Sequence, residues 1–192
     1  MSTSRWVEGP SVQTARLLIR RLRETDLADF LEYDGDPVLD RFRSRSPFTE
    51  DEAKEFIIFQ RSLPVGTESE WLYLAVVLES EEKVIGTVCL NLLSRQHQHG
   101  EVGWHLNPAY HGQGFATEAA RALLEFGFAE LDWHRISARC YEGNKPSLRL
   151  MERLGMRREA LLRETACLMD GEWHNEYGCG ILKTEWEVRP FH

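Results

Sequence analysis

The chain has 192 residues and a formal net charge of -8 at pH 7, with 42% hydrophobic and 28% charged residues. A chain of this length buries a full core without disulfides or a structural metal, so we expect one domain over residues 1–192. The negative charge argues against a nucleic-acid partner, because phosphate binding requires a basic face. No apolar run approaches the ~18 residues of a membrane span, so no membrane partner is expected.

The amino terminus and the cysteines point to a cytoplasmic protein. The first ten residues lack the apolar stretch of a signal peptide. The four cysteines, at positions 89, 140, 167 and 179, form no Cys-x-x-Cys pair, so neither a zinc site nor a redox pair is predicted. Those at 89, 140 and 179 lie in strand-like runs, which is typical of small buried apolar residues. Reduced cysteines fit a cytoplasmic location.

The first half of the chain predicts two helices followed by a hairpin sheet. Residues 1–13 read as a polar extension, and 16–22 as a first strand. Thr25-Asp26 is expected to cap one helix, and Thr49 with Glu52 forms a capping box for the next. Alternating and β-branched residues then predict three strands, over residues 71–78, 84–92 and 100–106.

The second half predicts two strand–helix units and a closing hairpin. A helix is expected over 114–131, a strand over 135–141 and a helix over 146–154 that ends at Gly155. Two last strands, 157–168 and 173–185, flank the turn at 169–172. Seven strands and four helices in this order indicate an α+β or mixed α/β fold.

The segment from Asn107 to Ala119 carries the clearest chemical signal. Gly112 and Gly114 precede a long helix, and Ala116 is small. Glycines let the backbone approach a ligand closely, and the unpaired N–H groups at the start of a helix attract anions. The arrangement is typical of a pyrophosphate cradle. It is neither a Walker loop nor the G-x-G-x-x-G dinucleotide fingerprint, and an ordinary loop is the competing interpretation.

Four segments in this order resemble the GNAT acetyltransferase superfamily, and more narrowly its Rim-type ribosomal-protein N-acetyltransferase branch. They are TARLLIRRLRETDLADF, EVGWHLNPAYHGQGFATEA, NKPSLRLMERLGMRRE and LMDGEWHNEYGCGILKTEW. The resemblance covers residues 14–187. It implies the GNAT fold: a central twisted, mostly antiparallel sheet of about seven strands with flanking helices. In that fold the strand 100–106 splays away from the strand 135–141.

The resemblance also implies acetyl-CoA as the cofactor and assigns the residues that bind it. The family's loop pattern, Arg/Gln-x-x-Gly-x-Gly/Ala, falls on His111, Gly114 and Ala116, so His111 departs from the usual first residue. The candidate cofactor-binding residues lie on the splayed strand, on the glycine loop with the helix start after it, and at the start of the helix 146–154: Trp104, His105, Leu106, His111, Gly112, Gln113, Gly114, Phe115, Ala116, Thr117, Asn144 and Ser147. For His111 the alternative is a surface histidine at a loop corner.

Attack of an amine on a thioester needs a base, a stabilised thioester oxygen and help for the leaving thiolate. Glu101 is the candidate base by resemblance, and a solvated strand-end carboxylate is the alternative. His105 competes, because histidine ordinarily titrates near pH ~6.5 and alternation puts it on the same strand face. Ser147 is the candidate donor of a hydrogen bond or proton to the thiolate, and a helix N-terminal cap is the alternative. Met151 stands where many family members have a tyrosine, and Tyr141 is a possible substitute.

The acceptor is expected to be a primary amine: a protein N-terminus by resemblance, or a small amine such as an aminoglycoside, polyamine or amino acid. A non-catalytic acyl-CoA-binding module is a further alternative. The resemblance also implies a homodimer. Aromatic residues are candidate liners of the acceptor groove: Phe30, Tyr33, Phe42, Phe48, Trp173 and Tyr177.

Overall fold

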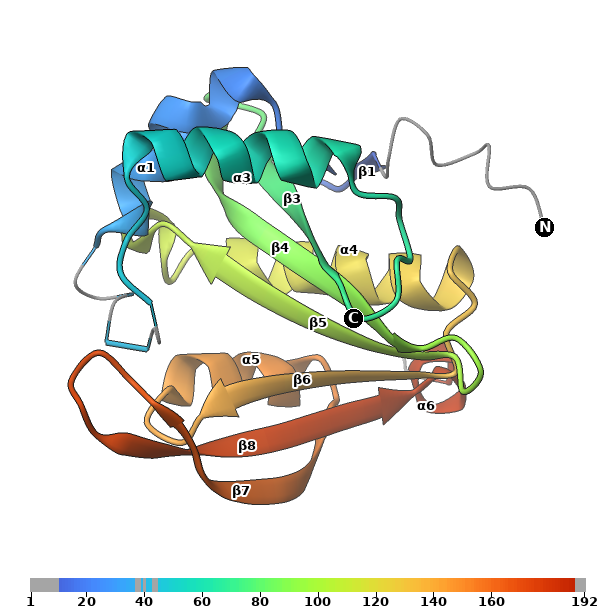
Figure 1. Ribbon diagram of the computed structural model, residues 1–192. Coiled ribbons are helices and arrows are strands. Elements are labelled where there is room, and N and C mark those ends of the chain that lie inside the picture. Colours follow the sequence, from blue (N-terminus) through green and yellow to red (C-terminus); the bar gives the residue numbers. More distant parts are fainter. Residues whose placement is uncertain (1–10, 37–38, 40, 43–44, 189–192) are drawn as a thin grey trace.

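The computed structural model describes residues 11–36, 39, 41–42 and 45–188. They form one twisted sheet with helices on both faces (Figure 1). The strands lie in the order β1-β2-β3-β4-β5-β6-β8-β7. Their bounds are β1 Val12–Gln13, β2 Leu17–Arg21, β3 Trp71–Leu78, β4 Lys83–Ser94, β5 His99–Leu106, β6 Arg135–Tyr141, β7 Arg157–Cys167 and β8 Trp173–Leu182. All neighbours are antiparallel except β5 and β6, which confirms the mostly antiparallel GNAT arrangement.

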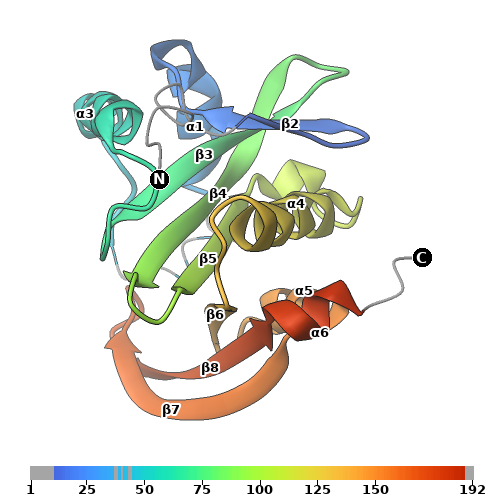
Figure 2. The same cartoon turned by 90° about the vertical axis from the view of Figure 1, so that its right-hand side faces the viewer.

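The helices divide between the two faces of the sheet (Figure 2). On one face, α4 packs on β2, β4, β5 and β6, with α5 beside it. On the other face, α1 packs on β4 and against α3. The helical bounds are η2 Glu24–Asp26, α1 Leu27–Asp34, α3 Glu50–Ser62, η3 Pro108–Tyr110, α4 Phe115–Ala129, α5 Lys145–Arg153 and α6 Lys183–Glu187. None of the described helices has the length and apolar character to span a bilayer.

Local sequence signals account for several element ends. Thr49 and Glu52 form the expected capping box: the Glu52 carboxylate accepts from Thr49 N at 2.8 Å. Gly155 follows α5 with a φ of 80°, the left-handed conformation that a glycine adopts at little cost. Gly171 has the same φ in the turn between β7 and β8. The strands and helices that these residues bound are where the sequence predicted them.

Three details differ from expectation. The sheet has eight strands where about seven were expected, because Val12–Gln13 pairs with β2; residues 1–10 of the expected extension lie outside the described residues. Thr25-Asp26 does not cap α1 with a side chain, since Asp26 is buried and binds Arg20 through two contacts of 2.8 and 2.9 Å. The last strand ends at Leu182, where α6 begins.

The main core lies between the sheet and α4, and it closes tightly around two glycines. A Cβ on Gly100 would lie 2.1 Å from the ring of Trp133, and one on Gly127 would lie 2.9 Å from it. Trp133 is only 3% exposed, so its ring cannot move aside into solvent. Gly100 therefore allows the α4–β6 connection to pack directly on β5, at the end where β5 and β6 pair.

We expect Gly100→Ala to destabilise the fold by at least 1–3 kcal/mol, the usual cost of overpacking a core. Gly178→Ala is the matched control, because its Cβ would meet nothing closer than Ala160 at 3.6 Å. Chemical denaturation of both variants measures the difference. Equal stability of the two would contradict the tight contact between Gly100 and Trp133.

Candidate active site

The site lies where β5 and β6 part. The two strands pair in parallel only over His99–Arg135, Gly100–Ile136 and Glu101–Ser137. Beyond these pairs they diverge, and Figure 1 shows their carboxyl ends opening away from each other. The expected splay between these two strands is thus present, with Glu101 at its vertex.

Every second residue of β5 points its backbone N–H and C=O groups into the opening between β5 and β6. Asn107 N donates to Ile85 O at 2.9 Å, so the residue after β5 pairs toward β4. By alternation, His105 also pairs toward β4, opposite Thr87, while Trp104 and Leu106 direct their N–H and C=O groups toward the gap. The side chains alternate too: Glu101 and His105 face α1 and α3, whereas Trp104 faces α4 and α5.

Glu101 sits at the vertex in a setting that favours a proton acceptor. It is 7% exposed, and its Oε1 lies 3.4 Å from Nε of Arg139 on β6. Burial raises the pKa of the Glu101 carboxyl above its usual range; the Arg139 charge opposes this shift and the Glu176 charge adds to it. His105 lies on the same face, where its ring meets that of Tyr33 edge-on at 5.8 Å.

Ser147 lies on the opposite face of β5, at the start of α5. Its Oγ accepts a hydrogen bond from Nε1 of Trp104 at 3.1 Å. The helix cap is Asn144, whose Oδ1 accepts from Ser147 N at 3.2 Å, so the capping interpretation of Ser147 does not hold. Because its oxygen already accepts from Trp104, the hydroxyl hydrogen of Ser147 remains available to another acceptor. Tyr141 lies on the Glu101 face instead, beside His174.

The glycine loop begins α4 as the sequence predicted. Gly112 and Gly114 have φ values of 76° and 84°, and Gly114 is the N-cap residue of α4, with no side chain capping it. The exposed loop residues therefore present backbone N–H groups at the positive end of a 15-residue helix. His111 is exposed and its Nε2 donates to Leu106 O at 2.9 Å, which holds the loop against the end of β5.

The remaining loop candidates anchor the cradle through their side chains. Phe115 is buried in the core, and Ala116 packs against it. Thr117 accepts from Arg153 of α5 at 3.2 Å. These contacts fix the first turn of α4 between the sheet and α5, so the loop's backbone is held while its N–H groups stay exposed.

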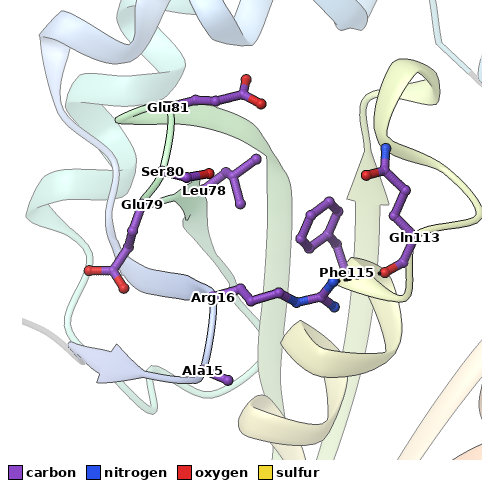
Figure 3. A pocket seen from close by; sticks show the side chains of 8 residues that line it. All are labelled: Ala15, Arg16, Leu78, Glu79, Ser80, Glu81, Gln113 and Phe115. Carbon is purple, nitrogen blue, oxygen red and sulfur yellow. Dashed lines mark hydrogen bonds between the residues drawn. The ribbon is translucent and has the colours of Figure 1, made fainter.

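Arg16 was not predicted as a site residue, although it holds the glycine loop through three contacts. Its guanidinium donates to Gln113 O at 3.0 Å, forms an ion pair with Glu118 at 2.7 Å and lies 4.2 Å from the ring centre of Phe115. Figure 3 shows it reaching across a pocket of about 450 Å³ toward Gln113 and Phe115. An arginine just before a strand gives no local sign of such a contact, because its partners lie about 100 residues away.

Of the expected groove aromatics, several belong to the core instead. Phe30 and Tyr33 are buried, and Phe48 packs against them between α1 and α3. Trp173 is 64% exposed at the start of β8. The three cysteines expected to be buried are buried, and burial raises the pKa of Cys89 to about 12, with the Glu101 charge contributing. Its thiol stays protonated at neutral pH and is no nucleophile.

Comparisons with known proteins agree with this geometry. The acetyltransferase (GNAT) domain family matches residues 16–157. The uncharacterized N-acetyltransferase YnaD of Bacillus subtilis (strain 168) is 38% identical over 176 residues, which is 91% of this chain and 98% of YnaD. A GNAT-family acetyltransferase structure from Bacillus anthracis superposes with a TM-score of 0.80 at 32% identity, over 92% of this chain and 100% of that one.

The same fold is found in a ribosomal-protein-S5-alanine acetyltransferase from Vibrio fischeri. It superposes with a TM-score of 0.80 at 22% identity, over 94% of this chain and all of that one. From the splayed strands, the glycine cradle at α4 and the matches over most of its length, the chain belongs to the GNAT family and is an N-acetyltransferase.

Proposed function

We propose that the chain transfers the acetyl group of acetyl-CoA to a primary amine by direct attack, with a protein N-terminal α-amine as the acceptor. The observation that carries this proposal is the position of Glu101: a buried carboxyl at the point where β5 and β6 stop pairing. A base there faces the α1 and α3 side, while the cofactor cradle lies at the far end of the same strand.

The residues present fit acetyl-CoA. The exposed N–H groups of Gln113, Gly114, Phe115 and Ala116 would hold its pyrophosphate at the α4 terminus. Within the gap, the backbone groups of Trp104 and the N–H of Leu106 would hold the pantetheine arm, and one of the two N–H groups would face the thioester oxygen. Bound acetyl-CoA supplies the acetyl group as a thioester. Asn144 contributes indirectly, by capping α5 and so fixing Ser147.

Two side chains of the protein would each assist one half of the reaction. Glu101 takes a proton from the acceptor on one side of β5, and Ser147 donates a hydrogen bond to the leaving sulfur on the other. An α-amine titrates near 7.7–8.0 and a lysine near 10.4, a difference of roughly 3.5 kcal/mol in deprotonation. A carboxyl base therefore favours the α-amine over a lysine.

A small polyamine is the second candidate acceptor. Spermidine N(1)-acetyltransferase of Escherichia coli (strain K12) is 24% identical over 110 residues, or 57% of this chain and 59% of that one. Glu101 and Glu176 share the acceptor side of the sheet, and the net charge of -8 favours approach of a cation. A thiol-release assay with acetyl-CoA and a panel of peptides, polyamines and aminoglycosides separates the two acceptors.

The proposal also covers the oligomeric state and the cellular location of the protein. We propose a cytoplasmic homodimer. The dimer is supported by β7, which forms one end of the sheet and whose residues are all exposed or half-buried. Light scattering after size exclusion distinguishes a dimer of twice the chain mass from a monomer.

We expect Glu101→Gln to lower kcat by about 100-fold or more, as loss of a general base does, with KM for acetyl-CoA unchanged. The wild-type rate should fall as the pH drops through the raised pKa of Glu101, because only the carboxylate accepts a proton. Thiol release between pH 5 and 9 measures both effects. Glu55→Gln, an exposed carboxylate on α3, is the control. An unchanged rate in Glu101→Gln would shift the role to His105, which His105→Gln tests.

For the leaving group, we expect Ser147→Ala to lower kcat about tenfold, the value of one hydrogen bond. Tyr141→Phe should leave kcat unchanged, because Tyr141 lies on the other face of the sheet. Steady-state rates of the two variants at saturating acetyl-CoA decide between them. A loss confined to Tyr141→Phe would reverse the assignment.

Gly114→Ala should weaken CoA binding about tenfold, since a side chain at φ 84° costs ~1–2 kcal/mol and displaces the loop amides. Gly171→Ala introduces the same strain at φ 80° in a distant open turn, so it should lose stability but retain CoA affinity. Isothermal titration with CoA compares them. If both variants bind CoA equally well, the cradle does not hold the cofactor.

A further inference from the structure

Asn91 is a buried amide whose acceptor atom the protein leaves unused. It lies in β4, is 6% exposed, and its Oδ1 is buried with no hydrogen-bond partner. Nearly all buried polar atoms in proteins are paired, and an exception calls for a physical reason. A strand this deep in the sheet would accept an apolar side chain without that deficit, as it does at Leu90 and Leu92.

The position of Asn91 points to Glu101. The two are Cα partners in the β4–β5 ladder, so their side chains lie on the same face with Cβ atoms roughly 4.5–5.5 Å apart. The Sγ of Cys89 and the ring of Trp71 reach toward Gly103 on that face and wall off the next position along β5. Glu101 Oε1 lies 3.4 Å from Nε of Arg139 on β6, the strand on the other side of β5 from β4.

A single water fits this arrangement chemically. Carboxylate and amide oxygens are acceptors, so a water between them donates one hydrogen to Glu101 and the other to Asn91 Oδ1. Both of its hydrogens are then committed, and only its lone pairs can face a third group. That third group must be a donor, which an acceptor ammonium is.

We propose that Asn91 is a positioning residue: its Oδ1 holds the water that relays a proton from the acceptor amine to Glu101. The inference rests on the proposed function and deepens it. An ammonium N–H bond breaks as the water oxygen takes that proton; the water O–H bond toward Glu101 breaks as the carboxyl O–H forms. The amine is left neutral for attack, and water is regenerated. Without Asn91, the water rotates and its lone pairs no longer point to the amine.

Two variants of Asn91 test its role in the relay. Asn91→Leu removes the acceptor, and we expect kcat to fall 10- to 100-fold (about the range of assisted proton transfer) at every pH, with KM for acetyl-CoA unchanged within about twofold. Asn91→Asp keeps an acceptor oxygen but adds a charge beside Glu101. We therefore expect its acid limb of kcat/KM to move up by about one pH unit or more, with the rate recovering at high pH.

The other charged and titratable groups around Glu101 are the same in the wild type and in both Asn91 variants. The charges facing it are Arg139 of β6 and Glu176 of β8, and the titratable neighbours on its face are Cys89 and His105. Leu90→Val, on the opposite face of the same strand, controls for lost stability through its thermal midpoint. Full activity in Asn91→Leu, or losses in both Asn91 variants that are alike at all pH values, would overturn the relay.

A crystal structure of the wild type with acetyl-CoA gives a readout independent of turnover. We expect an ordered water at roughly 2.7–3.2 Å from both Asn91 Oδ1 and a Glu101 oxygen, absent in Asn91→Leu. A structure without that water would refute the inference even if the enzyme is active. Conversely, failure of every amine to release thiol would count against the proposed function, while the water site would still decide the role of Asn91.

Discussion

The end of β5–β6 pairing is the constraint on which the site depends. Three residue pairs hold the two strands together, and continued pairing along β5 would close the gap and use the backbone groups of Trp104. Parallel strands in the middle of a sheet normally pair along their length, so leaving N–H and C=O groups unpaired costs free energy. The pairing is secured at one end by the Trp133 ring packed on Gly100. Beyond it, β6 stays with β8 over seven pairs while β5 stays with β4.

Because β5 is a strand, its period of two separates the chemistry onto two faces. Odd-numbered positions carry Glu101 and His105 toward α1 and α3, the proposed acceptor side, and the even-numbered Trp104 meets Ser147 on the other face. In the proposed reaction, one strand therefore supplies groups to both halves at fixed spacing. The helices follow this division: α4 and α5 lie on the proposed cofactor side, whereas α1 and α3 cover the proposed acceptor face.

Much of the fold was predictable from the sequence where an element end depends on neighbouring residues. The capping box at Thr49, the glycine at 155 and the glycine loop before α4 each depend on residues within one turn. The differences depend on tertiary contacts. The Asp26 side chain binds Arg20 on β2 instead of capping α1, and β8 ends where α6 begins, with Trp186 donating to Glu125 at 2.7 Å. The sequence cannot show these partners, because they are brought together by the sheet.

The residues of the candidate site, too, could be predicted only where the signal lies within one stretch of sequence. Glu101, His105 and the glycines were predicted as site residues from the family segments and from strand alternation. Asn91 and Arg139 escaped notice, since their nearness to Glu101 depends on the register of β4 and on the twist of β6. Register is set by whole strands rather than by any residue pair, and one residue of slip would turn Asn91 to the other face.

The attachment of the glycine loop to Arg16 has a consequence for the order in which the chain folds. The Glu118 carboxylate accepts from Thr14 Oγ1 at 2.6 Å and from Arg16 N at 2.9 Å, across 104 and 102 residues of chain. Closing so long a loop carries an entropy cost that local contacts do not repay. We therefore expect the glycine-loop end of α4 to take its final shape only after the amino-terminal edge of the sheet has docked. Fraying at that edge would loosen the cradle while leaving Glu101, on the far side of β5, in place.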